Sequence, residues 1–114
     1  MRDRVNGATI VDVGTGPPVV LVPGIQGRWE WMAPAVGALA RRCRVVTFSL
    51  CGERGSGVPI DGGLGFDCHV AQVERALDRA GLARAALCGV SFGGLIALRV
   101  AAKRPERVTH LVLV

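Results

Sequence analysis

The stretch that decides the fold is Ala85-Ala86-Leu87-Cys88-Gly89-Val90-Ser91-Phe92-Gly93-Gly94-Leu95-Ile96. It opens with a short apolar run, Ala85–Cys88, of the length of a buried strand, and continues into apolar residues at helical spacing over Phe92–Lys103. Between the two lies G-x-S-x-G, with glycines two residues before and two residues after Ser91. A serine at a sharp strand-to-helix turn leaves room only for neighbours without side chains. The pattern therefore predicts a Ser91 hydroxyl raised above the edge of a sheet.

The start of the following helix predicts the chemistry of this turn. Free N–H groups and the positive end of the helix dipole would point at the Ser91 hydroxyl, where an anionic intermediate would be stabilised. The backbone N–H of Phe92 is one expected oxyanion donor, and that of Ile25, in the glycine-containing loop 23–27, is the second. The alternative is that Ser91 only caps the helix, but a cap alone needs no glycine on both sides.

Strand-like and helix-like segments alternate along the rest of the chain. The predicted strands are 8–13, 19–22, 44–50, 85–88 and 108–114, the predicted helices are 31–42, 70–80 and 92–103, and a long glycine-rich loop covers 52–65. This alternation predicts an α/β fold, with a mostly parallel sheet and helices on both faces. Nucleotide-binding versions of that architecture are not favoured, because neither G-x-G-x-x-G nor G-x-x-x-x-G-K-[ST] occurs.

The order of the loop 23–27 and the Ser91 motif, with Arg104-Pro105-Glu106-Arg107-Val108 and the strand Leu111–Leu113 behind them, resembles the α/β-hydrolase family. The resemblance implies a serine-dependent hydrolase of esters or related acyl compounds, working through an acyl-enzyme on Ser91, with a small-molecule substrate and no cofactor. Two positions depart from the family pattern. Pro23-Gly24 stands where many members have His-Gly, and Ser49 stands where many have Asp.

The rest of the catalytic triad has no good candidate after Ser91. In the family the acid and the histidine follow later strands, whereas here only Glu106 and His110 follow the serine. His110 would lie about 13 Å down its strand from the site. His69, near a helix start, is a further candidate base, although a half-exposed helix histidine is the simpler interpretation. We therefore expect residues 1–114 to be a truncated, partial α/β-hydrolase domain that lacks the C-terminal strands with the acid and histidine, and to be nearly inert alone.

Other functions stay open at this point. The same fold supports acyl transfer, haloperoxidation and carbon–carbon bond hydrolysis, and a catalytically dead interaction module could keep the turn without a triad. The formal charge of +5 comes from scattered basic residues, which does not favour nucleic-acid binding. No apolar run has the length of a membrane span and no secretory signal is recognisable, so a cytoplasmic protein is expected. The four cysteines show no metal-ligand spacing and are predicted to be buried free thiols, with no metal site.

Overall fold

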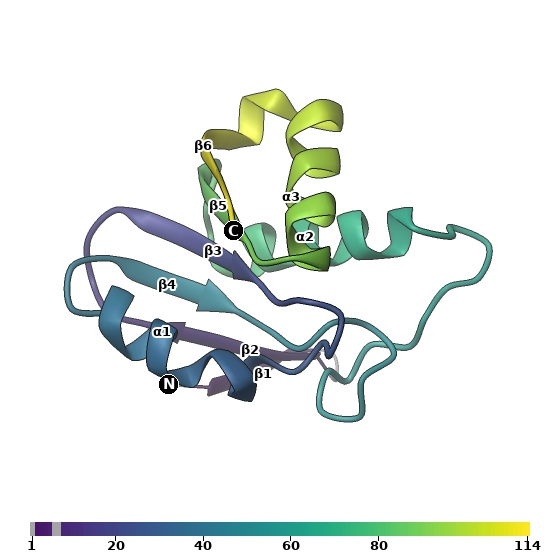
Figure 1. Ribbon diagram of the computed structural model, residues 1–114, viewed down its shortest axis with the longest axis horizontal. Helices are drawn as coiled ribbons and strands as arrows, with labels where there is room; N and C mark the ends of the chain where they lie inside the picture. The colour runs from purple at the N-terminus through teal and green to yellow at the C-terminus, as the bar shows by residue number, and fades with distance from the viewer. Residues whose placement is uncertain (1, 6–7) are drawn as a thin grey trace.

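A six-stranded sheet in the order β1-β2-β4-β3-β5-β6 forms the centre of the computed structural model, which describes residues 2–5 and 8–114 (Figure 1). Strands β3, β4, β5 and β6 run parallel, whereas β1 and β2 pair antiparallel at one edge. The predicted mostly parallel sheet is confirmed. The strands are β1 Arg2–Val5, β2 Ala8–Val13, β3 Pro18–Val22, β4 Arg44–Thr47, β5 Ala85–Gly89 and β6 Val108–Leu113.

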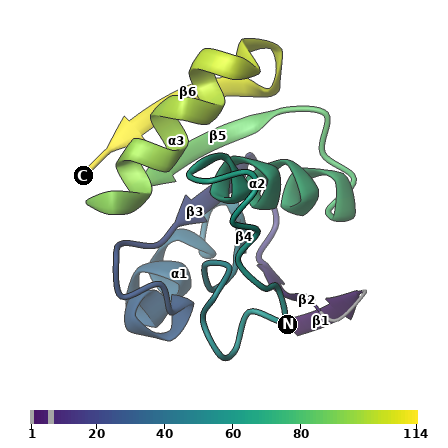
Figure 2. The same ribbon diagram turned by 90° about the vertical axis from the view of Figure 1, so that its right-hand side faces the viewer.

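Helices cover both faces of this sheet, as the alternating pattern predicts. Val20 and Val22 of β3 point into a core shared with α2 (Asp67–Arg79) and α3 (Phe92–Lys103). Leu21, on the opposite face, packs in a smaller core beside α1 (Ala33–Leu39). Two short 3-10 turns, η1 Trp29–Met32 and η2 Pro105–Arg107, precede α1 and β6. Figures 1 and 2 show α2 and α3 close together and α1 apart from them, across the sheet.

Three element boundaries differ from the sequence-based prediction. The helix expected over 31–42 is a 3-10 turn followed by α1, which ends at Leu39 because the chain must turn there to enter β4. The strand expected over 44–50 ends at Thr47, and Leu50 instead donates its N–H to the Gly27 carbonyl at 2.6 Å. Residues 48–50 are buried by loop packing, which gives the same apolar pattern as a strand. Strand β1 was not predicted.

The register of β3 and β5 brings two distant loops together. Val22 is opposite Gly89, so both strands end at the same level of the sheet, and the Val90 N–H donates to the Val22 carbonyl at 3.1 Å. The carboxyl ends of parallel strands form a crevice in which ligands commonly bind. The loop 23–27 and the turn at Ser91 therefore begin side by side.

The opposite edge of the sheet is formed by β6, whose outer side is open. Val112, Leu113 and Val114 are about half or more exposed, as are Leu95 and Leu98 of α3. An apolar edge strand of this kind can accept a further strand. Among the described residues, no helix has the length and apolar character needed to cross a membrane.

Candidate functional site

The backbone of Ser91 is strained in the way expected for a strand-to-helix turn. Its φ is 54° and its ψ is −116°, and it is the single non-glycine residue with positive φ in the described part of the chain. The strain costs on the order of 1–3 kcal/mol and persists where surrounding structure holds it. Ser91 is exposed and its side chain makes no capping hydrogen bond, so the interpretation of Ser91 as a simple helix cap is wrong.

The two flanking glycines are required by close backbone packing. A Cβ atom on Gly89 would overlap the backbone of Gly93 and Gly94, and one on Gly93 would overlap the carbonyl oxygens of Val22 and Pro23. No side-chain adjustment relieves an overlap with backbone. The glycines of the motif thus allow α3 to start directly against the ends of β3 and β5.

Hydrogen bonds fix the turn from both sides. The Ser91 N–H donates to the Val114 carbonyl at 2.7 Å, and the Val114 N–H donates to the Gly89 carbonyl at 2.9 Å, which extends the pairing of β5 and β6 through the turn. The Gly94 N–H donates to the Ser91 carbonyl at 2.8 Å. The position of the serine is therefore set by backbone contacts that do not involve its hydroxyl.

A hollow of about 300 Å³ joins Ser91 to the loop 23–27. A Cβ atom on Gly24 would lie 3.7 Å from the Cβ of Ser91, and a turn closed by the Gly27 N–H and the Gly24 carbonyl holds the loop in place. Ile25 lines the hollow together with Ser91, with its side chain 77% exposed. The predicted oxyanion loop and the predicted nucleophile are thus neighbours. The first N–H groups of α3, that of Phe92 among them, have no partner within the helix.

The histidine and acid that follow Ser91 in the sequence lie away from it. His110 is exposed on β6 and its Nδ1 lies 3.1 Å from Thr109 Oγ1. Glu106 belongs to η2, which follows the far end of α3. Within residues 2–5 and 8–114, Ser91 Oγ has no hydrogen bond to a histidine or a carboxylate. That neither residue is a triad member stays a prediction.

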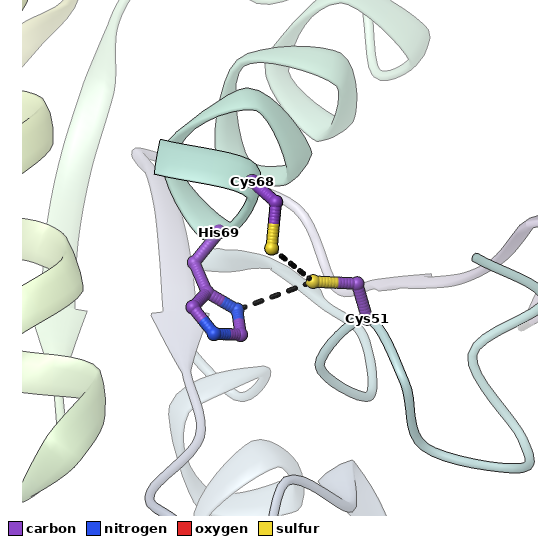
Figure 3. Close-up of side chains that lie close together, drawn as sticks. All are labelled: Cys51, Cys68 and His69. Atoms are coloured by element: carbon purple, nitrogen blue, oxygen red, sulfur yellow. Dashed lines mark hydrogen bonds between the residues drawn. The ribbon is translucent and has the colours of Figure 1, made fainter. Parts of the chain in front are cut away.

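His69 belongs to a group of residues that the sequence did not reveal. Cys51 follows β4, whereas Cys68 and His69 lie in the first turn of α2 (Figure 3). Cys51 Sγ is 3.2 Å from Cys68 Sγ and 3.3 Å from His69 Nδ1. Burial raises the pKa of the Cys51 thiol to about 12, with the hydrogen bond to Cys68 as the next cause, and burial lowers the pKa of His69. The available signal was the Cys68-His69 pair at a helix start that follows a long loop beginning at a cysteine.

Aromatic rings connect this group to the Ser91 turn. His69 and Phe92 meet edge to face with ring centroids 5.5 Å apart, and Phe66 packs edge to face on both at 5.8 Å. Such pairs stabilise a fixed arrangement by about 0.5–1.5 kcal/mol each. His69 is therefore held between Phe92, the residue after the serine, and Cys51.

Ser49, one of the two departures from the family pattern, has a structural role. It is buried, and its Oγ accepts the Trp29 N–H at 3.2 Å. Its carbonyl accepts the side-chain amide of Gln72 at 2.8 Å, and the same side chain accepts the Cys51 N–H at 2.8 Å. The loop after β4 is thereby tied both to α2 and to the segment that lines the hollow.

Comparisons with known proteins agree with this geometry. Residues 17–114 match the model of the alpha/beta hydrolase fold family. RutD of Azorhizobium caulinodans, named as a carbamate hydrolase, is 34% identical over 101 residues, which cover 89% of this chain and 38% of that protein. The 2-hydroxy-6-oxo-2,4-heptadienoate hydrolase of Pseudomonas putida is 37% identical over 106 residues, covering 90% and 38%. The crystal structure of an epoxide hydrolase from Vigna radiata has a TM-score of 0.84 at 22% identity, covering 99% and 37%, and shows likeness of fold.

Proposed function

We propose, from the premise that this chain belongs to the α/β-hydrolase fold family, that Ser91 is the nucleophile of a hydrolase that acts on acyl compounds. The observation that carries the proposal is the backbone of Ser91, which is strained, fixed at the carboxyl end of β5 and exposed beside the loop 23–27. The Ser91 oxygen would attack a carbonyl carbon. The N–H groups of Ile25 and Phe92 would then stabilise the resulting oxyanion.

A serine at this position favours acyl substrates over epoxides. Attack of a serine oxygen on a carbonyl gives an ester, which water can hydrolyse to regenerate the hydroxyl. Attack on an epoxide carbon would give an ether, which water does not cleave under these conditions, so the enzyme would be consumed. The likeness to an epoxide hydrolase therefore supports the fold, whereas Ser91 supports hydrolysis of esters, carbamates or related carbonyl compounds.

The hollow beside Ser91 suggests an apolar substrate group. Ile25, Trp31, Met32 and Val90 line it, and Arg28 contributes the charged side chain. Burying the apolar surface of an acyl group against such residues stabilises binding by about 25 cal/mol per Å² of buried area. We therefore expect a hydrophobic acyl group to be preferred over a small polar one.

The chain spans 38% of the length of each of the two curated relatives above. We propose that the acid and the base of the reaction come from the part of the protein that this chain does not span. In a polypeptide as long as those relatives, strands added at the open edge of β6 would supply an acid and a histidine in the order known for this fold. The serine hydroxyl without a base is a poor nucleophile at neutral pH. We accordingly expect the 114-residue chain alone to be a very weak catalyst.

Covalent labelling tests the nucleophile directly. A polypeptide as long as those relatives, which would carry the acid and the histidine, is incubated with a fluorophosphonate, a reagent that transfers its phosphonyl group to activated serines, and is then digested with trypsin. We expect the adduct on the peptide 85–99, which contains Ser91, and none on the peptides that contain Ser49 or Ser56. Equal labelling of all serines, or undiminished labelling of the Ser91→Ala variant, would contradict the assignment.

Hydrolysis of an activated ester tests the missing base. The rate of the 114-residue chain should exceed that of water by at most about 10³–10⁴, the residual catalysis that an oxyanion hole and binding provide. Ser91→Ala and His69→Ala serve as controls. A normal enzymatic rate that both substitutions abolish would identify His69 as the base and refute the need for further strands.

A further inference from the structure

The group formed by Cys51, Cys68 and His69 has the composition of a metal-binding site. Its three donor atoms, two Sγ and one imidazole nitrogen, all lie within 4.8 Å of one another. Both cysteines are buried and His69 is half-buried, and all four cysteines of the chain are free thiols. Figure 3 shows the three side chains converging, with Cys51 reaching the first turn of α2 from the opposite side.

We propose that Cys51, Cys68 and His69 bind a divalent zinc ion, with water as the fourth ligand. Thiolate and imidazole are the ligands that Zn²⁺ prefers, in tetrahedral geometry. Zinc–sulfur bonds of about 2.3 Å and zinc–nitrogen bonds of about 2.0–2.1 Å would place the donor atoms roughly 3.6–3.8 Å apart. Cys51 Sγ lies 3.2 Å from Cys68 Sγ and 3.3 Å from His69 Nδ1, so each separation needs to open by only about half an ångström or less to reach those values.

The charges in the site balance when the metal is bound. Binding releases both thiol protons to solvent, so two thiolates and a neutral imidazole would neutralise the Zn²⁺ charge. A neutral complex is compatible with the burial of Cys51 and Cys68, which disfavours an isolated thiolate. The half-exposed His69 leaves one side open to water, and its edge-to-face contact with Phe92 helps to orient the ring.

The site would close the long loop between β4 and α2 at its base. Cys51 and Cys68 are 17 positions apart, and the loop between them is mostly exposed. A metal that joins the two ends removes conformational freedom from the unfolded chain, as other cross-links of loops do. Gln72, which accepts the Cys51 N–H, already holds one end in place. The metal would thus stabilise the first turn of α2, where His69 packs against Phe92, without touching Ser91.

Metal titration tests this proposal. The reduced, chelator-treated 114-residue chain, with its helical circular dichroism verified, is titrated with Co²⁺ as a spectroscopic probe and then with Zn²⁺ in competition with a chromogenic chelator. We expect one equivalent to bind, with sulfur-to-cobalt charge-transfer absorption and the visible bands of tetrahedral Co²⁺. The variants Cys51→Ser and Cys68→Ser should each weaken Zn²⁺ affinity on the order of 100-fold or more. Cys43→Ser and Cys88→Ser, which alter the two other free thiols, should bind like the original chain.

A second measurement uses the unaltered chain, so that it does not depend on the folding of a variant. Arg54 is the single basic residue in the loop 52–66 and is exposed, so trypsin should cleave after it. Saturating Zn²⁺ should slow that cleavage at least about tenfold, because the closed loop opens less often. Zn²⁺ should slow cleavage of the Cys43→Ser variant as much as cleavage of the unaltered chain, whereas it should not change the cleavage rate of the Cys51→Ser variant.

Three results would overturn the proposal. The first is binding of less than one equivalent by the reduced chain. The second is binding that survives substitution of Cys51 and Cys68 but is lost on substitution of Cys43 or Cys88. The third is a chain in which Cys51 and Cys68 resist alkylation until a disulfide reductant is added, and which takes up no Zn²⁺ after reduction. That last result would identify the pair as a disulfide instead.

Discussion

The turn at Ser91 and the group Cys51, Cys68 and His69 lie on the two sides of Phe92 and are built in opposite ways. The turn is made from a contiguous stretch of chain, is held by backbone hydrogen bonds and glycine packing, and leaves its side chain exposed and without a capping bond. The group is made from two segments 17 positions apart, its two cysteines are buried, and it is held by bonds between side chains.

The difference shows which part of the sequence determines each structure. A strained turn can be specified by its own sequence, because the residues that make room for Ser91 are its neighbours in the chain. A cluster of ligands is specified by the packing of α2 against the loop after β4, which depends on the whole core. The turn at Ser91 should keep its structure when residues elsewhere in the chain are changed and lose it when its own residues are changed. The arrangement of Cys51, Cys68 and His69 should instead be sensitive to changes elsewhere in the core.

The sharpest test of this comparison exchanges a glycine of the turn. Gly93→Ala places a Cβ against the Val22 and Pro23 carbonyls, and we expect a loss of about 3 kcal/mol or more in the free energy of unfolding. Gly37→Ala is the matched control, since Gly37 also lies in an α-helix but has open space around it, and it should stabilise by about 0.5–1 kcal/mol. Urea unfolding followed by circular dichroism measures both. Equal effects would mean that the turn is not set by local packing.

The corresponding test of the second region concerns Gln72, the buried side chain that connects α2 to the loop. Gln72→Leu leaves the Cys51 N–H and the Ser49 carbonyl buried without partners, which should cost about 2 kcal/mol. An exposed change on the same helix, Arg79→Leu, should stay within about 0.5 kcal/mol. Hydrogen exchange should locate the effect of Gln72→Leu at the start of the loop. If exchange increased equally at the Ser91 turn, the two regions would not be independent.

Strain at the turn predicts a stabilising substitution. Ser91→Gly removes the steric cost of positive φ, and no hydrogen bond of the side chain is lost, so the free energy of unfolding should rise by about 1 kcal/mol. Ser91→Ala keeps the strain and should leave stability nearly unchanged. Thermal unfolding of the three chains provides the comparison. A destabilised glycine variant would show that the serine side chain contributes contacts after all.

The smallest effect is expected at a site remote from both regions, the ion pair between Asp12 and Arg44, with 2.7 Å between Asp12 Oδ2 and Arg44 Nη2. The hydrogen bond from Arg44 is the main cause that holds the pKa of Asp12 below 3.8. Because this pKa is lower in the folded state, the stabilisation is fully present above about pH 4 and is lost as the pH falls through the folded value. Asp12→Asn should therefore cost about 0.5–1 kcal/mol at pH 7, discounted for partial exposure, and nothing in strong acid. A difference that is independent of pH would contradict this origin.

Much of the fold follows from local sequence, and the exceptions have a common cause. The segment Phe92–Lys103 is helical as predicted, because its spacing, its glycine-rich start and Pro105 all agree. The strand after Arg44 was predicted too long, since residues 48–50 are buried by a loop and not by a neighbouring strand. A run of apolar residues indicates that a segment is buried. The length of a strand is instead decided by where its partner strand ends, and the sequence does not show which strand is the partner.

The candidate site divides in the same manner. That Ser91 and Ile25 lie beside each other was predictable, because the glycines around each residue indicate tight turns that leave little room for a side chain. The roles of Ile25 and Phe92 as oxyanion donors stay predictions. The approach of Cys51 to His69 was not predictable from spacing, because 18 positions of loop and helix separate them and only the packed core fixes their distance.

The backbone angle at Ser91 also bears on how easily this molecule could be redesigned. Among residues with a side chain, aspartate and asparagine adopt positive φ most readily, several times more often than others. The backbone at Ser91 should therefore tolerate an aspartate better than a branched residue such as valine. An aspartate there would offer a carboxylate oxygen whose alkyl ester water can cleave. On the function proposed above, one substitution at this position would thus shift the atoms that the nucleophile can attack from carbonyl carbons toward saturated carbons.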